Sequence, residues 1–344
     1  MDTGSDSADA PTLMRRGGHL TGMRLGVAPP TFATDGWRLP AGRLERFATK
    51  AEAEGFSGIW TTEHLLHPPG RNYSRLDPFV TMSTLAGATS TITIGTAVLI
   101  LPMRDPVLFA QRAATLQYLS EERLTVGVGA GWVEAEYDAV GVPFEERGPR
   151  FTEGLALVRR LLSGDHVTFE GEFYEVEDVR IEPAVDRPPR ILVGGGGVDT
   201  DDGRTVPEPV KARILDHADG WIAPPRQPSA IAEDWSEIAD YLDAAGRDPS
   251  TLDRVALSWL HLVPGVSSEL AEEKQRRVLV RDRNADPERT DEALGKQLTG
   301  SLEDVRARIG EYEQMGFDEL VLGPTTHEPA AVDAQLDYWA DLLL

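Results

Sequence analysis

The chain has 344 residues, 41% of them hydrophobic, which is enough to bury a substantial core. It contains no cysteine, and this excludes disulfide bonds, thiolate metal sites and cysteine nucleophiles. With 57 acidic and 34 basic residues, its net charge of −23 repels nucleic-acid phosphates and anionic membranes. We therefore expect no nucleic-acid partner and no membrane partner.

The beginning of the chain is polar and rich in glycine. We interpret residues 1–22 as a disordered tail, with Met23 as a second candidate for the start. Arg15-Arg16 is followed by two glycines rather than an apolar stretch, which argues against a secretory or twin-arginine signal. No apolar run approaches the roughly 20 residues that a membrane-spanning helix needs. These features favour a cytoplasmic protein.

The basic residues are almost all arginine. Lysine occurs at only four positions: Lys50, Lys211, Lys274 and Lys296. An acidic, lysine-poor surface stays hydrated in concentrated salt, where screening removes most self-repulsion. The composition therefore favours a halophile's cytosol, and a GC-rich genome that favours arginine codons is the alternative.

Short apolar segments recur along the chain from Met23 onward. Eight of them are predicted to be β-strands: 24–28, 58–62, 92–99, 123–129, 189–195, 219–224, 254–263 and 319–323. They are rich in Val, Ile and Leu without polar alternation, which is typical of parallel strands buried on both faces. Helical patterns alternate with them, so we predict an α/β fold, a (β/α)₈ barrel forming one domain over residues 23–344.

Punctuation residues mark several of the helices and two insertions. A helix is predicted to open at Pro40 and to end at Gly55, and Ser301 with Asp304 resembles a capping box. Residues 166–183 alternate with period two and predict a β-hairpin insertion. Residues 264–300 are charged and predict a helical insertion before the last βα unit.

Reactive residues of such barrels lie at the C-terminal ends of the strands. His64 follows the second strand and can act as a general acid or base near neutral pH, and Glu63 beside it could orient or tune nearby groups. A structural role is commoner for an arbitrary histidine, but the strand-end position favours function here. His67 and His327 are candidate rim residues. The other histidines are interpreted as structural: His19, His166, His217 and His261.

Two glycine-rich segments also follow strands. The backbone N–H groups of Gly194, Gly195, Gly196 and Gly197 could hold a phosphate, and a flexible turn is the alternative. Glycines 127, 129 and 131 would let a flat group approach the fourth strand, and tight packing is the alternative. The scattered histidines include no HxH or HExxH pattern, so no metal site is predicted, and no GxSxG serine nucleophile is present.

Residues 92–162 (ITIGTAVLIL…LVRRLL) resemble the luciferase-like monooxygenase superfamily, most of all its branch of coenzyme F420-dependent oxidoreductases. Residues 51–64, 187–197 and 212–222 support the resemblance, which covers roughly residues 23–344. The most specific part is GVGAGW with GVPFEERGPRFTE, within residues 127–153.

The resemblance implies a barrel, commonly a homodimer, whose cofactor ring lies at the C-terminal mouth. His64 matches a histidine at the ring face that often takes part in proton transfer. The peptide bond Ala97–Val98 matches the position of a non-proline cis bond beneath the ring. The residues implied to contact the cofactor are Ala97, Val98, Leu99, Gly129, Gly131, Trp132, Glu134 and the phosphate-side glycines Gly194 to Gly197.

The chain departs from the sugar-phosphate dehydrogenases of this family. They carry an acidic residue where Trp132 stands, with Glu134 only two positions later. They also have a ring-side tryptophan at the position of Pro68, and aspartate in place of Glu63. A sugar-phosphate substrate is therefore disfavoured, and FMN stays open as the cofactor. A hydrophobic or mixed small-molecule substrate is favoured by Trp132 and by an apolar rim: Leu65, Leu66 and Phe144.

Three functions remain as hypotheses. The first is an oxidoreductase that transfers hydride between coenzyme F420 and a small organic substrate, with His64 handling a proton. The second is an FMN-dependent monooxygenase that uses reduced flavin and oxygen. The third is a non-catalytic protein that binds the cofactor without turning over a substrate.

Overall fold

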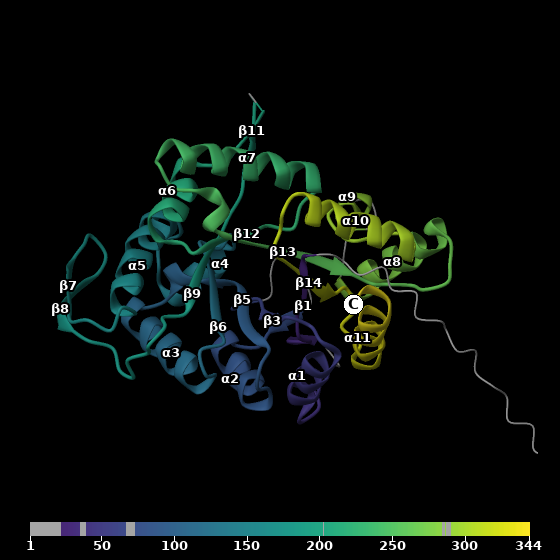
Figure 1. Ribbon diagram of the computed structural model, residues 1–344, viewed down its shortest axis with the longest axis horizontal. Coiled ribbons are helices and arrows are strands. Elements are labelled where there is room, and N and C mark those ends of the chain that lie inside the picture. The colour runs from purple at the N-terminus through teal and green to yellow at the C-terminus, as the bar shows by residue number, and fades with distance from the viewer. Residues whose placement is uncertain (1–21, 35–38, 67–72, 202, 284–285, 287–289) are drawn as a thin grey trace, which may run out of the picture.

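The computed structural model describes residues 22–34, 39–66, 73–201, 203–283, 286 and 290–344. Its centre is a closed barrel of parallel strands in the order β1-β14-β13-β12-β9-β6-β5-β3, surrounded by helices (Figure 1). The barrel strands are β1 (Arg24–Val27), β3 (Gly58–Thr61), β5 (Thr93–Ile100), β6 (Leu124–Gly129), β9 (Arg190–Gly194), β12 (Gly220–Ala223), β13 (Asp253–Leu260) and β14 (Glu319–Pro324). The fold is therefore a (β/α)₈ barrel, and all eight predicted strands are confirmed.

Helices cover the outside of the barrel. They are α1 (Arg43–Glu54), α2 (Pro78–Ala88), α3 (Pro106–Leu119), α5 (Arg147–Leu161), α6 (Glu208–His217), α7 (Pro228–Ala244), α10 (Leu302–Gln314) and α11 (Pro329–Leu343). The capping box of Ser301 and Asp304 is present, and Gly55 ends α1 in the left-handed conformation. That helix begins at Arg43 rather than Pro40, because Gly42 has a φ of 70°. None of the described helices is both long and apolar enough to cross a membrane.

Both predicted insertions are confirmed. β7 (Val167–Glu170) and β8 (Glu175–Val179) form the antiparallel hairpin, and α8 (Ser268–Arg283) and α9 (Thr290–Gly295) form the helical segment. Two small strand pairs were not predicted: β2 (Phe32–Thr34) with β4 (Tyr73–Arg75), and β10 (Val198–Thr200) with β11 (Gly203–Thr205). They lie in the loops that follow β1, β3 and β9, at the C-terminal side of the barrel.

The interior of the barrel is filled around Trp60, whose side chain is fully buried. Its indole N–H donates to the carboxyl of Glu319 at 2.9 Å, and the hydroxyl of Ser57 donates to the same oxygen at 2.7 Å. A Cβ on Gly58 or Gly95 would overlap the indole, so glycine is required beside it. The lower barrel is therefore solid, and a ligand site is restricted to the C-terminal mouth.

Candidate active site

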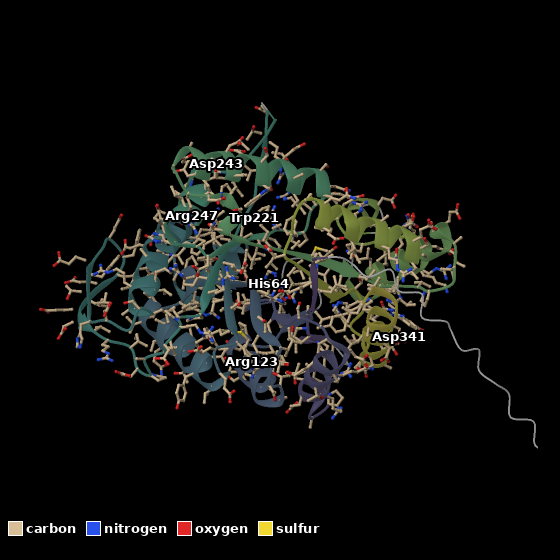
Figure 2. The ribbon with its side chains drawn as sticks, in the orientation of Figure 1. His64, Arg123, Trp221, Asp243, Arg247 and Asp341 are labelled. Atoms are coloured by element: carbon tan, nitrogen blue, oxygen red, sulfur yellow. The ribbon has the colours of Figure 1, made fainter. Side chains whose placement is uncertain are left out.

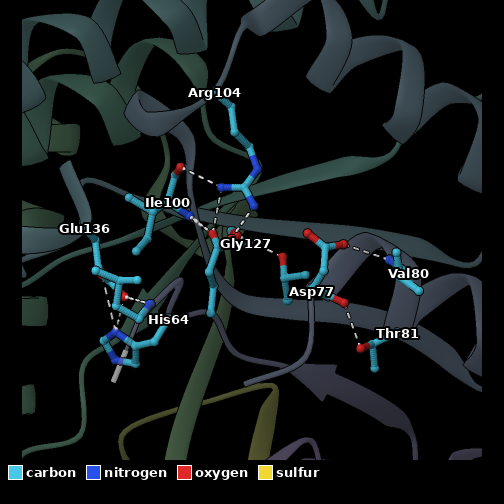
Figure 3. Close-up of polar contacts among 11 residues, drawn as sticks. His64, Asp77, Val80, Thr81, Ile100, Arg104, Gly127 and Glu136 are labelled. Carbon is cyan, nitrogen blue, oxygen red and sulfur yellow. Dashed lines mark hydrogen bonds and ion pairs between the residues drawn. The ribbon is translucent and has the colours of Figure 1, made fainter. Parts of the chain in front are cut away.

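His64 lies directly after β3, near the centre of the molecule (Figure 2). Its Nδ1 lies 3.2 Å and 3.5 Å from the two carboxylate oxygens of Glu136 (Figure 3). The imidazole is 15% exposed, whereas the Glu136 side chain is completely buried. This pair joins the ends of two barrel strands, because Glu136 belongs to α4 (Glu134–Val140), which follows β6.

The Glu136 carboxylate also accepts the backbone N–H of Leu66 at 3.1 Å. Burial would raise the pKa of this carboxyl, but the hydrogen bonds from His64 and Leu66 and the charge of His64 outweigh burial and hold the pKa below its usual value. Glu136 is therefore an acceptor at neutral pH, and it fixes one nitrogen of the imidazole.

Sequence reasoning missed Glu136, although a signal was present. Val133, Glu136 and Tyr137 follow the i, i+3, i+4 spacing of the buried face of a helix, and all three are buried. A carboxylate at an inward position needs a partner, and the strand-end histidine of the neighbouring unit is the partner available. By contrast, Glu134 is exposed at the start of α4.

The Glu63 carboxylate contacts a different part of the site from His64. It accepts the Ile100 N–H at 2.7 Å and the guanidinium of Arg104 at 2.9 Å. Burial raises the pKa of the Glu63 carboxyl, and Arg104 and the Ile100 N–H oppose this effect. These contacts hold the C-terminal end of β5 in place. Glu63 therefore positions that strand end rather than bonding directly to His64.

The strand β5 is irregular at the mouth, where its register with β6 shifts between Thr96 and Leu99. The Ala97–Val98 peptide bond is cis, as the resemblance implies. Ala97 and Val98 pack toward the barrel interior, whereas the Leu99 side chain is fully buried in the layer between strands and helices. Only the first two of these side chains therefore face the inside of the barrel.

The glycines of β6 and β9 make room for neighbouring side chains. A Cβ on Gly129 would lie 2.8 Å from a Val98 methyl, and one on Gly194 would lie 2.7 Å from the other Val98 methyl. Gly131, at a φ of 68°, would place a Cβ 2.8 Å from Ile100. These contacts support tight packing as the reason for the three glycines, and their contact with a cofactor stays a prediction.

Trp132 is brought close to His64. It is 64% exposed, and its ring meets the imidazole edge-on with 5.8 Å between centroids and an interplanar angle of 87°. Leu65 and Leu66 are also exposed beside it. Phe144 packs against Tyr137, with 5.4 Å between ring centroids. Trp132, Leu65 and Leu66 thus form an exposed apolar edge next to the imidazole, and Phe144 packs one residue further away, on Tyr137.

The glycine loop after β9 is held by its carbonyl groups. The indole of Trp221 donates to the Gly195 carbonyl at 2.6 Å, and Arg204 donates to the Gly197 carbonyl at 2.8 Å. In the part of the chain that the structure describes, the N–H groups of Gly196 and Gly197 donate to no acceptor. A fixed loop with two unengaged N–H groups can accept an anion.

Arg226 is a further candidate that sequence reasoning missed. It lies in the loop after β12, two residues beyond Pro224, which would contact a Cβ on Gly196. Its Nε is buried without a partner, and its guanidinium makes no hydrogen bond or ion pair with any described residue. An arginine without a partner among the described residues is unusual in a chain with 57 acidic residues.

The remaining histidine candidates have different outcomes. His67 and Pro68 lie outside the described residues. His327 was expected at the pocket rim, but it is 8% exposed and its backbone N–H donates to Asp282 at 3.4 Å. His261 lies just past the end of β13 rather than inside the strand. Burial lowers the pKa of the His261 imidazole.

A cavity of about 450 Å³ lies at the opposite, N-terminal end of the barrel, beside β9 and β12. Its arginines are bonded within the protein: Arg159 pairs with Asp219 at 2.7 Å, and Arg247 donates to carbonyls at the end of α6 at 2.6–2.7 Å. In barrels of this fold the N-terminal end contributes to stability, whereas active sites lie at the C-terminal end. No group of His, Asp and Glu suited to a metal ion occurs among the described residues.

The closed parallel barrel places the chain in the class of (β/α)₈ proteins, whose ligand sites lie at the C-terminal face, where the carboxylate-held imidazole of His64 stands here. The model of the luciferase-like monooxygenase family matches residues 18–319. The chain belongs to this family.

Two curated relatives carry informative names. An F420-dependent hydroxymycolic acid dehydrogenase of Mycobacterium tuberculosis is 31% identical over 219 residues, which cover 62% of this chain and 57% of the relative. An F420-dependent glucose-6-phosphate dehydrogenase of Kineococcus radiotolerans is 36% identical over 163 residues, covering 45% of this chain and 47% of the relative. The chain thus spans about half the length of these relatives.

Solved structures share the fold over nearly the whole chain. An F420-dependent secondary alcohol dehydrogenase in complex with an F420-acetone adduct superposes with a TM-score of 0.76 at 20% identity, covering 94% of this chain and 98% of that chain. The monooxygenase RslO1 from Streptomyces bottropensis gives 0.74 at 23% identity, covering 93% and 98%. The oxygenating constituent of an FMN-bound 3,6-diketocamphane monooxygenase from Pseudomonas putida gives 0.69 at 16% identity, covering 93% and 97%.

Proposed function

We propose that this protein is an oxidoreductase that uses coenzyme F420 to transfer a hydride to or from a small organic substrate. The observation that carries the proposal is His64 at the barrel mouth, with Nδ1 held by a buried carboxylate and the rest of the ring beside an open aromatic rim. The names of the F420-dependent relatives support the choice of cofactor.

The residues at the mouth fit a flavin-like group with a phosphate. The N–H groups of Gly196 and Gly197 and the guanidinium of Arg226, which have no partner among the described residues, are suited to hold the phosphate. Ala97 and Val98 line the interior side of the mouth, where the ring of such a group would lie. When bound, a deazaflavin supplies or accepts the hydride at its C5 carbon.

The chain's own residues then handle the proton and the substrate. His64 takes up or releases a proton through the nitrogen that Glu136 does not hold. Trp132, Leu65 and Leu66 form an apolar wall that excludes water and favours a hydrophobic or mixed substrate. No acidic group stands at the position of Trp132, which disfavours a sugar phosphate.

An FMN-dependent monooxygenase is the second candidate. Many FMN enzymes of this family carry glutamate at the position of Glu63, and this favours the monooxygenase. The FMN-bound neighbour also shares the fold. Both candidates use the same mouth, so the cofactor distinguishes them.

Reconstitution of the purified protein tests the choice. We expect tight binding of coenzyme F420, seen as a change in its absorbance and fluorescence, and hydride exchange with a panel of alcohols and ketones under anaerobic conditions. Oxygen-dependent turnover supported only by reduced FMN would replace this proposal with the monooxygenase. Tight binding without turnover of any substrate would favour a non-catalytic cofactor-binding protein.

We further propose that the protein forms a homodimer through α2 and α3, which lie side by side (Figure 1). Neither helix contains an acidic residue, yet large apolar side chains are exposed on both: Val80, Leu108, Tyr118 and Leu119. In a chain of net charge −23, two copies can meet without facing carboxylates along these helices.

Light scattering tests the dimer. We expect a dimeric wild type, a monomeric Leu108→Glu variant, and a dimeric control in which the exposed Leu270 of α8 is replaced by glutamate. A monomeric wild type would contradict the proposal.

A further inference from the structure

The contact between Glu136 and His64 restricts the protonation of the imidazole. The Glu136 carboxylate is completely buried, and the Oε1 atom that lies 3.2 Å from Nδ1 also accepts the Leu66 N–H at 3.1 Å. An ionised carboxylate can only accept hydrogen bonds. A hydrogen bond between this carboxylate and Nδ1 therefore requires a proton on Nδ1.

His64 is the one ionisable partner of Glu136 in the described part of the chain. Among the described residues, no arginine or lysine forms an ion pair with it. The Leu66 N–H satisfies part of this buried carboxylate, and an Nδ1–H group on His64 is the side-chain donor available for the rest. The neighbouring carboxylate, Glu63, is already bonded to Ile100 and Arg104.

We infer that Glu136 is a positioning residue that fixes His64 in the tautomer with the proton on Nδ1, so that protons enter and leave the ring only through Nε2. Trp132, packed edge-on at 5.8 Å, restricts the ring from the side of the rim. An isolated neutral imidazole side chain prefers the proton on Nε2, so the carboxylate reverses the intrinsic preference. The geometry makes Nε2 the basic nitrogen at the mouth.

This inference rests on the proposed function only for its effect on turnover, since the tautomer is a property of the chain itself. The inference also defines the path of the proton through the ring. The neutral ring can accept a proton at Nε2 from a ligand, and the charged ring can return it from the same atom, while Nδ1 stays bonded to Glu136 throughout. Proton transfer then requires no reorientation of the imidazole.

Nitrogen-15 NMR of the full-length chain, labelled at histidine, tests the inference without a cofactor. The His64 signals are assigned by their loss in His64→Ala. At a pH where the ring is neutral, we expect the pattern of an Nδ1–H tautomer. In Glu136→Gln, whose amide can donate to the ring, we expect the Nε2–H form to become a major species. The control is Asp138→Asn, which removes an exposed carboxylate from the same helix and should leave the tautomer unchanged.

An Nε2–H tautomer in the wild-type chain would overturn the inference, and this measurement stands even if Glu136→Gln fails to fold. An unchanged tautomer in a folded Glu136→Gln would overturn it as well. Where turnover is established, we expect Glu136→Gln to lower kcat by about 10²-fold with little change in KM, because a misplaced proton disables the base without removing a substrate contact. The Nδ1–H tautomer together with no turnover would contradict the proposed function alone.

Discussion

His64 is the residue at which the proposed chemistry can be separated from folding, because its ring is anchored by one neighbour and packs against one exposed indole. We expect His64→Ala to keep the fold and the binding of the cofactor and to lose at least about 10²-fold in turnover, the scale of a general acid or base. The control is His166→Ala, in the exposed hairpin, where the imidazole pairs with Asp178 at 2.8 Å. Wild-type turnover in His64→Ala would remove this residue from the mechanism.

A second prediction concerns Glu319 and the pH dependence of stability. It is 2% exposed, and burial raises the pKa of its carboxyl despite the hydrogen bonds from Ser57 and Trp60. A carboxyl whose pKa is raised on folding contributes stability below its unfolded pKa and loses that contribution as pH rises through the folded pKa. We therefore expect Glu319→Gln to gain stability relative to the wild type as pH rises from about 4.5, the ordinary value. Urea unfolding from pH 4.5 to 9 measures the difference, and a difference that is constant with pH would contradict the prediction.

The residues of the site were predictable to different degrees. His64 could be found from its position after a strand, since barrel ligand sites gather there. Glu136 could not be found by reading strand ends alone, because it lies in the first helical turns beyond β6 and is identified only by its inward position. Arg226 was also missed, since an unpaired arginine cannot be distinguished from a paired one until its neighbours are placed.

At the scale of the elements, the strands could be predicted from the sequence, but the structural role of their glycines could not. Buried parallel strands have continuous apolar runs, which the eight segments show clearly. Gly129 and Gly194, however, face the methyl groups of Val98 from a third strand, β5. A contact between strands 30 or more residues apart leaves no local sequence pattern. Tight packing and close approach of a ligand were therefore both open as explanations for these glycines.

This arrangement predicts coupled substitutions. Gly194→Ala places a methyl 2.7 Å from Val98, so we expect it to destabilise the fold by about 1–3 kcal/mol. In a Val98→Ala background the same substitution should cost less, because the obstructing methyl groups are gone. Urea unfolding of the wild type, the two single variants and the double variant measures the coupling. Gly310→Ala, in α10 where a Cβ meets nothing, is the control and should be neutral or stabilising. Purely additive effects would contradict the packing account.

At the scale of the whole molecule, the charge of −23 is the dominant feature, and we propose that it is an adaptation to salt. Molar KCl should then raise the melting temperature strongly, since screening removes self-repulsion, and each kcal/mol gained corresponds to about 2 °C for a chain of this size. A melting temperature that does not change from low to molar KCl would contradict this proposal and would favour codon usage as the origin of the arginine bias.

The closed floor of the barrel has a kinetic consequence. Trp60 and Glu319 fill the interior beneath the mouth, so whatever reaches His64 arrives and departs through one opening. Two ligands that share one entrance cannot exchange independently when one of them lies beneath the other. A cofactor seated against Ala97 and Val98 must therefore enter before the substrate, and the product must leave before the cofactor can be renewed. Steady-state kinetics should show compulsory-order binding, in which the spent cofactor competes against fresh cofactor and the product does not.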